Sequence, residues 1–368
     1  MRIFYDGFIY DYQAHGGINR YFNEIIARLP EDAIPAVSTY LGRRENWPAH
    51  PRLQPVHSKP LARWPALRGL RDLMMKTRVA MTRTDVMHPT FYQMLTPGGA
   101  RGLRGRVVVT VMDMIHEIYG ALIDPDGAVA RAKAECIGRA DAILCISENT
   151  RTDLVERFPS AEAKCRVTPL ASSMSVDDEL AANAPKPARP YFLHVGGRET
   201  YKNFTQLLRT WARFQDLRPD VHLLVVGRQW LASEQKLLEA LQIEGSVRHC
   251  GPADDAQLAV LYRQSLALIY PSLYEGFGIP PLEAMRCGTA VICTRKSSLP
   301  EVCGEAALYF DPEDDDSLLS RMIEHADSED SRAACIVRGQ AQAQLFSWER
   351  TAGQTIDTYR HLGVKGAE

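Results

Sequence analysis

The sequence predicts an α/β protein made of two doubly wound parallel-sheet domains, and three observations lead to this prediction. Short runs rich in Val, Ile, Leu and Ala alternate with helical patterns throughout, which is typical of successive strand–helix units. The chain has 368 residues, too many for one ordinary core and suited to two domains. The stretch "VDDELAANAPKPARP" at 176–190 is rich in Ala and Pro and lacks an apolar period, which favours an interdomain linker.

The candidate strands form one series on each side of this linker. The first series is "RIFY" (2–5), "IPAVSTYL" (34–41), "DVMH" (85–88), "RVVVTVMD" (106–113), "DAILCIS" (141–147) and "RVTPL" (166–170). The second series is "YFLHVG" (191–196), "VHLLVVG" (221–227), "VRHCG" (247–251), "LALIYPS" (266–272), "TAVICT" (289–294) and "AALYF" (306–310). Helical segments separate the runs, so each series is expected to form a parallel sheet.

We therefore expect an N-terminal domain over residues 1–180 and a C-terminal domain over residues 190–345. The closing stretch "SWERTAGQTIDTYRHL" has the pattern of an amphipathic helix, and residues 346–368 are expected to pack back across the N-terminal domain. Two such domains form a cleft, and doubly wound sheets bind ligands at the carboxyl ends of their strands. Chemistry is therefore expected in the loops that follow the strands.

Composition narrows the class of protein. The chain is 45% hydrophobic and 24% charged with a net charge of −2, so it has no general attraction to nucleic acid. No apolar run approaches the roughly 20 residues that span a bilayer. The N-terminal "MRIFYDGFIY" lacks the cleavage region of a signal peptide. None of the eight cysteines lies in a CxxC motif. They are expected to be reduced thiols in the core, which favours a cytoplasmic protein.

The stretch "HVGGRETYKNF" at 194–204 has the composition of an anion site. A buried strand ends before two glycines, of which Gly197 is the second, and a helix begins a few residues later. Such a turn presents backbone N–H groups and the positive end of a helix. Arg198 and Lys202 add positive charge to the same loop. A solvated turn with ordinary surface cations remains the alternative, and the chain has no GxGxxG dinucleotide motif.

The stretch "YEGFGIPPLEA" at 274–284 places Glu275 in the loop after a strand and Glu283 in the helix that follows. Two prolines suit the first turn of that helix. A carboxylate near the positive helix end is favoured and could accept both hydroxyls of a ribose. Gly276 and Gly278 allow the backbone to approach a ligand closely. Helix electrostatics alone would explain Glu283 but not the glycine–aromatic–glycine loop before it.

These two glutamates, separated by seven residues, resemble the EX7E motif of GT-B retaining glycosyltransferases, specifically glycosyltransferase family 4. Other stretches resemble the family in the same order over nearly the whole chain: "GGINRYFNEI" (16–25), "TVMDMIHEIY" (110–119), "CISENTRTDL" (145–154), "VGGRETYKN" (195–203), "PSLYEGFGIPPLEAMRCGTAVI" (271–292), "SSLPEV" (297–302) and "FSWERT" (346–351). The resemblance implies a GT-B architecture, in which two Rossmann-like domains face each other across a deep cleft.

The resemblance also implies roles. Arg198 and Lys202 would hold the donor diphosphate, Glu283 would accept the ribose hydroxyls, and Glu275 would face the donor sugar. The implied donor-binding set is Gly16, Gly17, Gly197, Arg198, Lys202, Glu275, Gly276, Phe277, Gly278, Ile279 and Glu283. The implied catalytic set is Glu275, Arg198, Lys202 and His116.

On the acceptor side of the cleft the resemblance places Asp113 and His116. Many members of the family carry a histidine where Met112 stands, and His116 is the nearest histidine here. The Asp-x-Asp look-alikes at 314–316 and 124–126 are interpreted as an acidic helix start and a turn, and no metal or other cofactor is expected. His88, His194 and His249 are expected to be packed or to line the cleft.

The implied function is a metal-independent, retaining transfer of a hexose from a nucleotide-sugar donor. Mannose or a related sugar from a GDP-sugar is favoured, with a hydroxyl of a glycan or lipid-linked oligosaccharide as acceptor, in the synthesis of a surface polysaccharide such as O-antigen lipopolysaccharide. Two alternatives stay open. One is a non-catalytic nucleotide- or glycan-binding GT-B protein, and the other is a different GT-B enzyme, such as a sugar-nucleotide epimerase or a phosphorylase.

Residues 52–83 carry eight lysines and arginines against a single acid, with apolar residues interleaved. A basic amphipathic segment of this kind can lie on an anionic membrane surface. It would then hold the protein peripherally on the inner face of the cytoplasmic membrane, where lipid-linked acceptors reside. A solvated helix face over the core of the N-terminal domain is the alternative.

Overall fold

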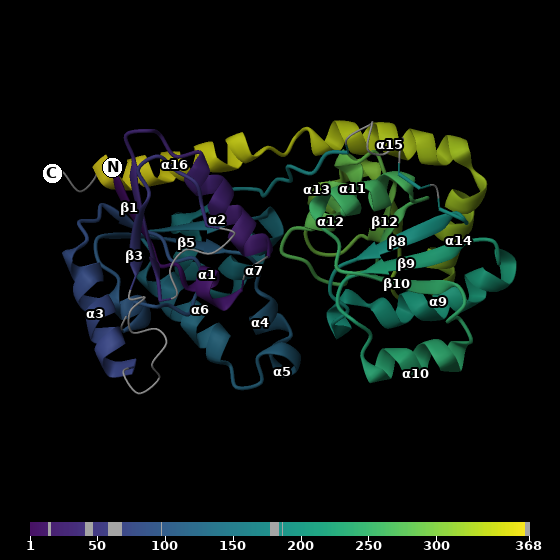
Figure 1. The fold of residues 1–368 in the computed structure, drawn as a ribbon, viewed down its shortest axis with the longest axis horizontal. Helices are drawn as coiled ribbons and strands as arrows, with labels where there is room; N and C mark the ends of the chain where they lie inside the picture. Colours follow the sequence, from purple (N-terminus) through teal and green to yellow (C-terminus); the bar gives the residue numbers. More distant parts are fainter. Residues whose placement is uncertain are drawn as a thin grey trace. The chain divides into compact units, whose positions relative to one another are not determined.

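The structure is a computed structural model that describes residues 1–13, 16–40, 47–57, 68–96, 98–176, 184–185 and 187–364. The chain divides into two compact units, one of Met1–Leu170 with Trp348–Glu368 and one of Ala171–Ser347. Figure 1 labels the elements of each. The boundary after Leu170 precedes the linker expected at 176–190, of which residues 177–183 and 186 lie outside the described part.

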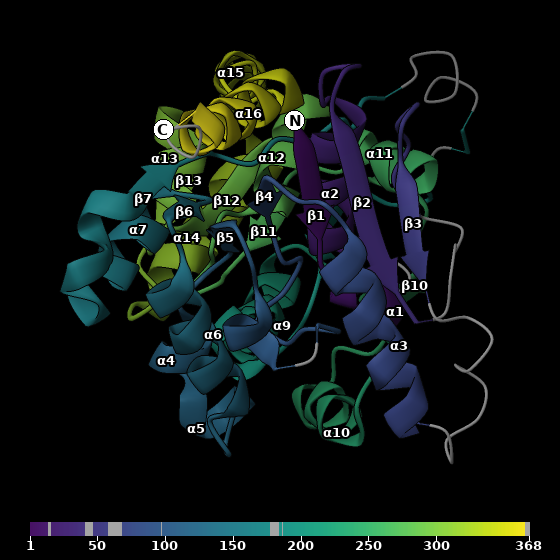
Figure 2. The same cartoon turned by 90° about the vertical axis from the view of Figure 1, so that its left-hand side faces the viewer.

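In the first unit, the described residues form a seven-stranded parallel sheet of order β3-β2-β1-β4-β5-β6-β7. Figure 2 shows β1, β2 and β3 side by side. The strands are β1 (Arg2–Tyr5), β2 (Ile34–Thr39), β3 (Gln54–His57), β4 (Val86–Met87), β5 (Arg106–Val111), β6 (Ala142–Cys145) and β7 (Cys165–Val167). The helices are α1 (Phe8–Tyr12), α2 (Gly17–Ala27), α3 (Arg68–Met81), η3 (Gly99–Gly102), α4 (Ile115–Ile118), α5 (Gly120–Ile123), α6 (Ala128–Arg139), α7 (Glu148–Arg157), η4 (Pro159–Lys164) and α16 (Trp348–Val364).

The C-terminal helix α16 belongs to this first unit, where it packs against α2, β4 and β5. Its Tyr359 is fully buried, and the Tyr359 hydroxyl lies 2.6 Å from Nδ1 of His88 and 3.2 Å from the hydroxyl of Tyr5. The other ring nitrogen of His88 lies 2.8 Å from the hydroxyl of Thr110. Burial lowers the pKa of His88 to about 3, so the ring is neutral and part of the core, as expected from its strand position.

In the second unit, the described residues form a six-stranded parallel sheet of order β10-β9-β8-β11-β12-β13. The strands are β8 (Tyr191–Val195), β9 (His222–Val226), β10 (Val247–Gly251), β11 (Leu268–Tyr270), β12 (Val291–Thr294) and β13 (Leu308–Phe310). The helices are η5 (Thr200–Lys202), α9 (Phe204–Leu217), α10 (Ala232–Leu241), α11 (Asp255–Gln264), α12 (Ile279–Arg286), α13 (Leu299–Cys303), η6 (Gly304–Ala306), α14 (Asp315–Asp327) and α15 (Glu329–Ala343).

Helices cover both faces of this second sheet. The helix α9 packs against α10 and α14, and α12 packs against α11, α13 and α15 (Figure 1). Trp211 and Phe214 on α9 are fully buried in the resulting core. In this doubly wound order, the chain reverses direction across the sheet between the neighbouring strands β8 and β11. The loops after such a pair of strands border the crevice where ligands of these folds bind.

The expected strands all appear, most of them shortened by one or two residues at an end. The strand β3 was missed, because its sequence "QPVH" contains a proline and is not an apolar run. The acidic triplet at 314–316 caps and opens α14, as predicted. Among the described residues, no helix combines the length and hydropathy needed to cross a membrane.

Candidate donor and acceptor sites

The loops after β8 and β11 meet through a buried ion pair. Lys202 Nζ lies 2.7 and 2.9 Å from the two carboxylate oxygens of Glu275. The two side chains are only 16% and 10% exposed. The backbone N–H of Leu273 also donates to the carbonyl of Tyr201, at 2.8 Å. Because β8 and β11 are neighbours, residues far apart in sequence come together at this edge of the sheet.

The loop that holds Glu275 is fixed by its backbone. The backbone N–H of Glu275 donates to the Ser297 hydroxyl at 2.9 Å. The hydroxyl of Ser298 donates to the carbonyls of Glu275 and Phe277, at 2.9 and 2.7 Å. Gly278 then caps α12 with φ of +108°, a value that favours glycine. The Phe277 side chain is buried, so at this position only the backbone could contact a ligand.

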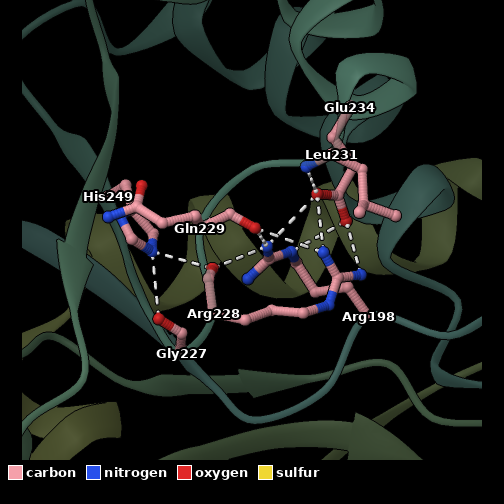
Figure 3. Close-up of polar contacts among 7 residues, drawn as sticks. All are labelled: Arg198, Gly227, Arg228, Gln229, Leu231, Glu234 and His249. Carbon is pink, nitrogen blue, oxygen red and sulfur yellow. Dashed lines mark hydrogen bonds and ion pairs between the residues drawn. The ribbon is translucent and has the colours of Figure 1, made fainter.

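The Arg198 side chain is buried and lies against the start of α10 (Figure 3). Its Nε donates to Glu234 at 2.9 Å, and its Nη2 donates to the carbonyls of Arg228 and Gln229 at 2.8 and 2.9 Å. The guanidinium also stacks 4.7 Å from the ring centre of Trp230. Arg198 therefore holds protein groups on one edge, and its contacts with the described residues include no hydrogen bond or ion pair to Lys202 or Glu275.

Glu234 also binds Arg228 and the backbone N–H of Leu231, the residue that caps α10. Nη1 and Nη2 of Arg228 each donate to the Glu234 carboxylate at 3.2 Å, and the N–H of Leu231 donates to it at 2.6 Å. Burial would raise the pKa of Glu234, but the bonds from Arg198, Leu231 and Arg228 outweigh it and lower that pKa. The carboxylate is thus ionised at neutral pH. His249 Nε2 donates to the carbonyls of Gly227 and Arg228, which braces the same turn (Figure 3).

Glu283 lies in the second turn of α12 and is 6% exposed. The hydroxyl of Tyr262, on α11, donates to its carboxylate at 3.3 Å. Burial and the charge of Glu283 raise the pKa of Tyr262 well above its ordinary value, so the phenol keeps its proton and can donate. Gly276 and Ile279 lie between the two glutamates, in the loop and at the first position of α12.

In the first unit, Asp113 and His116 follow β5, at the carboxyl edge of its sheet. They lie over Lys133, a lysine of α6 whose side chain is fully buried. Its Nζ donates to the Asp113 carbonyl at 2.9 Å and to Glu117 at 2.8 Å. Burial, followed by the charge of Lys133, lowers the pKa of His116. Among the described residues, two buried atoms here have no hydrogen-bond partner, Nδ1 of His116 and Oε1 of Glu117, and a functional role is one explanation for such atoms.

Gly16 and Gly17 begin the helix α2 of the first unit. A side chain at Gly16 would collide with the amide of Gln13, whereas Gly17 faces open space. These glycines, like Asp113 and His116, belong to the first unit, whereas the donor loops belong to the second. Within the second unit, the structure brings Lys202 and Glu275 together and places Arg198 on Glu234.

Sequence reasoning missed Glu234 and Lys133. Lys133 could have been noticed, because Val129, Cys136 and Ile137 lie four before, three after and four after it, on one helix face. A lysine on an apolar face is a signal of a paired, buried charge. Glu234 occupies the third position of α10, a common place for a helix-capping acid, and nothing in the sequence names its arginine partners.

The basic segment at 52–83 is described only in part. Residues 58–67 lie outside the described residues, as do several side chains of α3. Met75 and Val79 of α3 are buried in the core, whereas Leu70, Leu73 and Met81 are 50%, 59% and 80% exposed. Within the described part, no group of three or more His, Cys, Asp and Glu side chains is arranged to hold a metal ion.

Comparisons with known proteins agree with these features. Residues 15–171 match the family described as Glycosyltransferase Family 4, and residues 175–342 match Glycosyl transferases group 1. The O-antigen chain mannosyltransferase B of Escherichia coli is 33% identical over 242 residues, which cover 62% of each chain. The chain thus spans less than two thirds of the length of the curated relatives first matched.

Two solved structures share the fold. The sucrose-phosphate synthase of Thermosynechococcus elongatus has a TM-score of 0.79 and 20% identity over 99% of both chains. HepE of Anabaena, solved with UDP and glucose, has a TM-score of 0.72 and 16% identity over 98% of this chain and 99% of its own. The predicted class of two Rossmann-like domains of GT-B type is confirmed. The chain therefore carries a glycosyltransferase family 4 domain at residues 15–171 and a glycosyl transferases group 1 domain at residues 175–342.

Proposed function

We propose that the chain transfers mannose, or a closely related hexose, from a GDP-sugar to a hydroxyl of a glycan or lipid-linked oligosaccharide. The transfer retains the anomeric configuration and needs no bound metal ion. The donor lies on the second unit and the acceptor beside Asp113 and His116. The name of the Escherichia coli relative, O-antigen chain mannosyltransferase B, supports both the sugar and a surface polysaccharide as product.

The observation that carries this proposal is the Lys202–Glu275 pair at the ligand-binding edge of the second sheet. An ammonium group has three N–H donors, and Glu275 takes two of them. The third is available for an oxygen of the donor diphosphate. Glu275 is held beside the cation by the serine contacts of its backbone, in the position that a sugar hydroxyl would share.

Breaking the bond between sugar and diphosphate leaves negative charge on the diphosphate. Fixed cations stabilise such charge strongly in a closed site of low dielectric constant. Each charge-assisted hydrogen bond contributes roughly 1.5–3 kcal/mol, so Lys202 and Arg198 together could take the part of a metal ion. An oxygen of the departing phosphate then accepts the proton of the acceptor hydroxyl, and the hydroxyl arrives on the face that the diphosphate leaves.

The test is transfer to a synthetic lipid-linked mannoside in EDTA. GDP-mannose, UDP-glucose and ADP-glucose are compared as donors, and the product is analysed by NMR. We expect turnover with GDP-mannose alone and an α-linked product, which preserves the configuration of the donor. An absolute requirement for Mg²⁺ or Mn²⁺, or an inverted product, would contradict the mechanism. Binding of the donor without any turnover would favour the non-catalytic alternative.

We also propose that residues 52–83 dock the protein on the inner face of the cytoplasmic membrane. Their excess of positive charge and the exposed Leu70, Leu73 and Met81 of α3 support this. In liposome flotation, we expect binding to vesicles that contain anionic lipid, weakening as salt is raised. Flotation that is independent of anionic lipid would contradict the docking and leave the proposed chemistry untouched.

A further inference from the structure

The Glu234 carboxylate accepts five hydrogen bonds. Oε1 receives Arg198 Nε and Arg228 Nη2, and Oε2 receives Arg198 Nη2, Arg228 Nη1 and the N–H of Leu231, all at 2.6–3.2 Å (Figure 3). The Arg198 side chain beneath it is fully buried. A buried guanidinium needs a partner, because an unpaired charge in the interior is strongly destabilising. Glu234 supplies that partner.

The Nη1 edge of the Arg198 guanidinium is not engaged by Glu234. Nη1 of Arg198 is buried and has no hydrogen-bond partner among the described residues. It lies beside the glycine turn that follows β9, since a Cβ added to Gly227 would sit 3.6 Å from it. Gly227 and Gly196, the first residues after β9 and β8, both have positive φ, of +147° and +120°. Because Gly227 carries no side chain, the backbone of its turn comes close to Nη1.

We propose that Glu234 is a positioning residue for the donor diphosphate. It holds Arg198 by the Nε and Nη2 edge and so presents the Nη1 edge to a phosphate oxygen at the glycine turns. The inference rests on the proposed function, because it takes a nucleoside diphosphate as the ligand of this edge. A glutamine in its place would offer one oxygen in place of two and would leave the buried cation without a counter-charge.

The change in nucleotide affinity on replacing Glu234 could also have the opposite sign. If Glu234 only repelled or competed with phosphate, its neutralisation would strengthen binding, because a like charge would be removed from the site. Positioning predicts that binding weakens instead. The sign of one affinity change therefore separates the two roles.

The experiment measures the dissociation constants of GDP and UDP by isothermal titration calorimetry at fixed ionic strength. It compares the wild type, Glu234→Gln and Glu239→Gln. Glu239 lies on the same helix, is exposed, and makes the matched change of charge away from Arg198. We expect Glu234→Gln to weaken nucleotide binding about tenfold, and Glu239→Gln to stay within about twofold of the wild type. Equal or tighter binding by Glu234→Gln would overturn the positioning role.

A double-mutant cycle tests whether Glu234 acts through Arg198. In an Arg198→Met background, Glu234→Gln should cause no further loss of affinity, since there is no guanidinium left to position. An equal loss in both backgrounds would overturn the inference, and it would expose a general disturbance of the fold. A wild type that binds neither nucleotide would overturn the proposed donor site, whereas tight wild-type binding with an unaffected Glu234→Gln overturns the positioning role alone.

Discussion

The Lys202–Glu275 pair gives a prediction in which stability and activity respond differently. Replacing Lys202 by Met removes two hydrogen bonds, of 2.7 and 2.9 Å, and leaves the Glu275 carboxylate 10% exposed without its counter-charge. Breaking a buried ion pair costs about 3–5 kcal/mol. Because both side chains keep some contact with solvent, we take the lower end, about 3 kcal/mol. Glu275→Met should cost a similar amount, since it leaves the ammonium unpaired.

The double variant Lys202→Met/Glu275→Met contains no unpaired charge, so it should lose no more than either single variant. With about 3 kcal/mol lost in each case, the coupling energy is about 3 kcal/mol. Urea unfolding followed by tryptophan fluorescence measures all four proteins. The exposed pair Arg213–Asp316 serves as a control and should show a coupling below about 1 kcal/mol.

Activity should not follow stability in this cycle. The double variant should fold as well as the single variants and yet transfer no sugar, because both proposed donor contacts are gone. If the loss of stability in the double variant equalled the sum of the two single-variant losses, the predicted coupling between Lys202 and Glu275 would be refuted. A double variant that transfers sugar at the wild-type rate would refute the proposed role of both residues.

Three further outcomes are expected. Burial and the charge of Lys133 lower the pKa of His116, so Lys133→Met should raise the titration midpoint of His116 in NMR, and an unmoved midpoint would contradict the cluster. Burial lowers the pKa of His88 to about 3, so its contribution to stability is complete above the unfolded value near 6.5 and falls away as the pH drops toward 3. Urea unfolding should show a loss of about 2 kcal/mol at pH 5 from this group, and His88→Gln should remove that part of the slope. Gly278→Ala should cost about 1–3 kcal/mol, because φ is +108° and the new Cβ would lie 2.9 Å from Leu299; thermal unfolding at the wild-type temperature would contradict the strain.

Much of the fold could be predicted from the sequence, because its strands are short apolar runs between helices. The runs at 191–196 and 221–227 became β8 and β9 with little change. β3 could not be read, since "QPVH" gains its strand conformation from pairing with β2 and not from its own pattern. Tertiary pairing decides such edge strands.

The residue types of the site could be predicted from the sequence, but their ion-pair partners could not. Arg198 and Lys202 were both predicted to hold phosphate, and the sequence gives no sign that each already holds a carboxylate. Lys202 meets Glu275 because β8 and β11 are neighbours in the sheet, and strand order is a property of the folded chain. Arg198 meets Glu234 through the turn after β9, for the same reason. The ion-pair partner of a charged loop residue is therefore set by the segment that lies beside it in the fold.

The placement of α16 has a consequence for how the protein is made. The helix supplies Tyr359 to the core of the first unit, next to His88 and Tyr5, although all of the second unit precedes it in the chain. On the ribosome, the second unit can therefore finish folding while the first still lacks the Tyr359 side chain, whose hydroxyl contacts both His88 and Tyr5. In a nascent chain stalled before residue 348, His88 and Tyr5 should accordingly stay accessible to proteases and chaperones, and release of α16 from the ribosome should cover them.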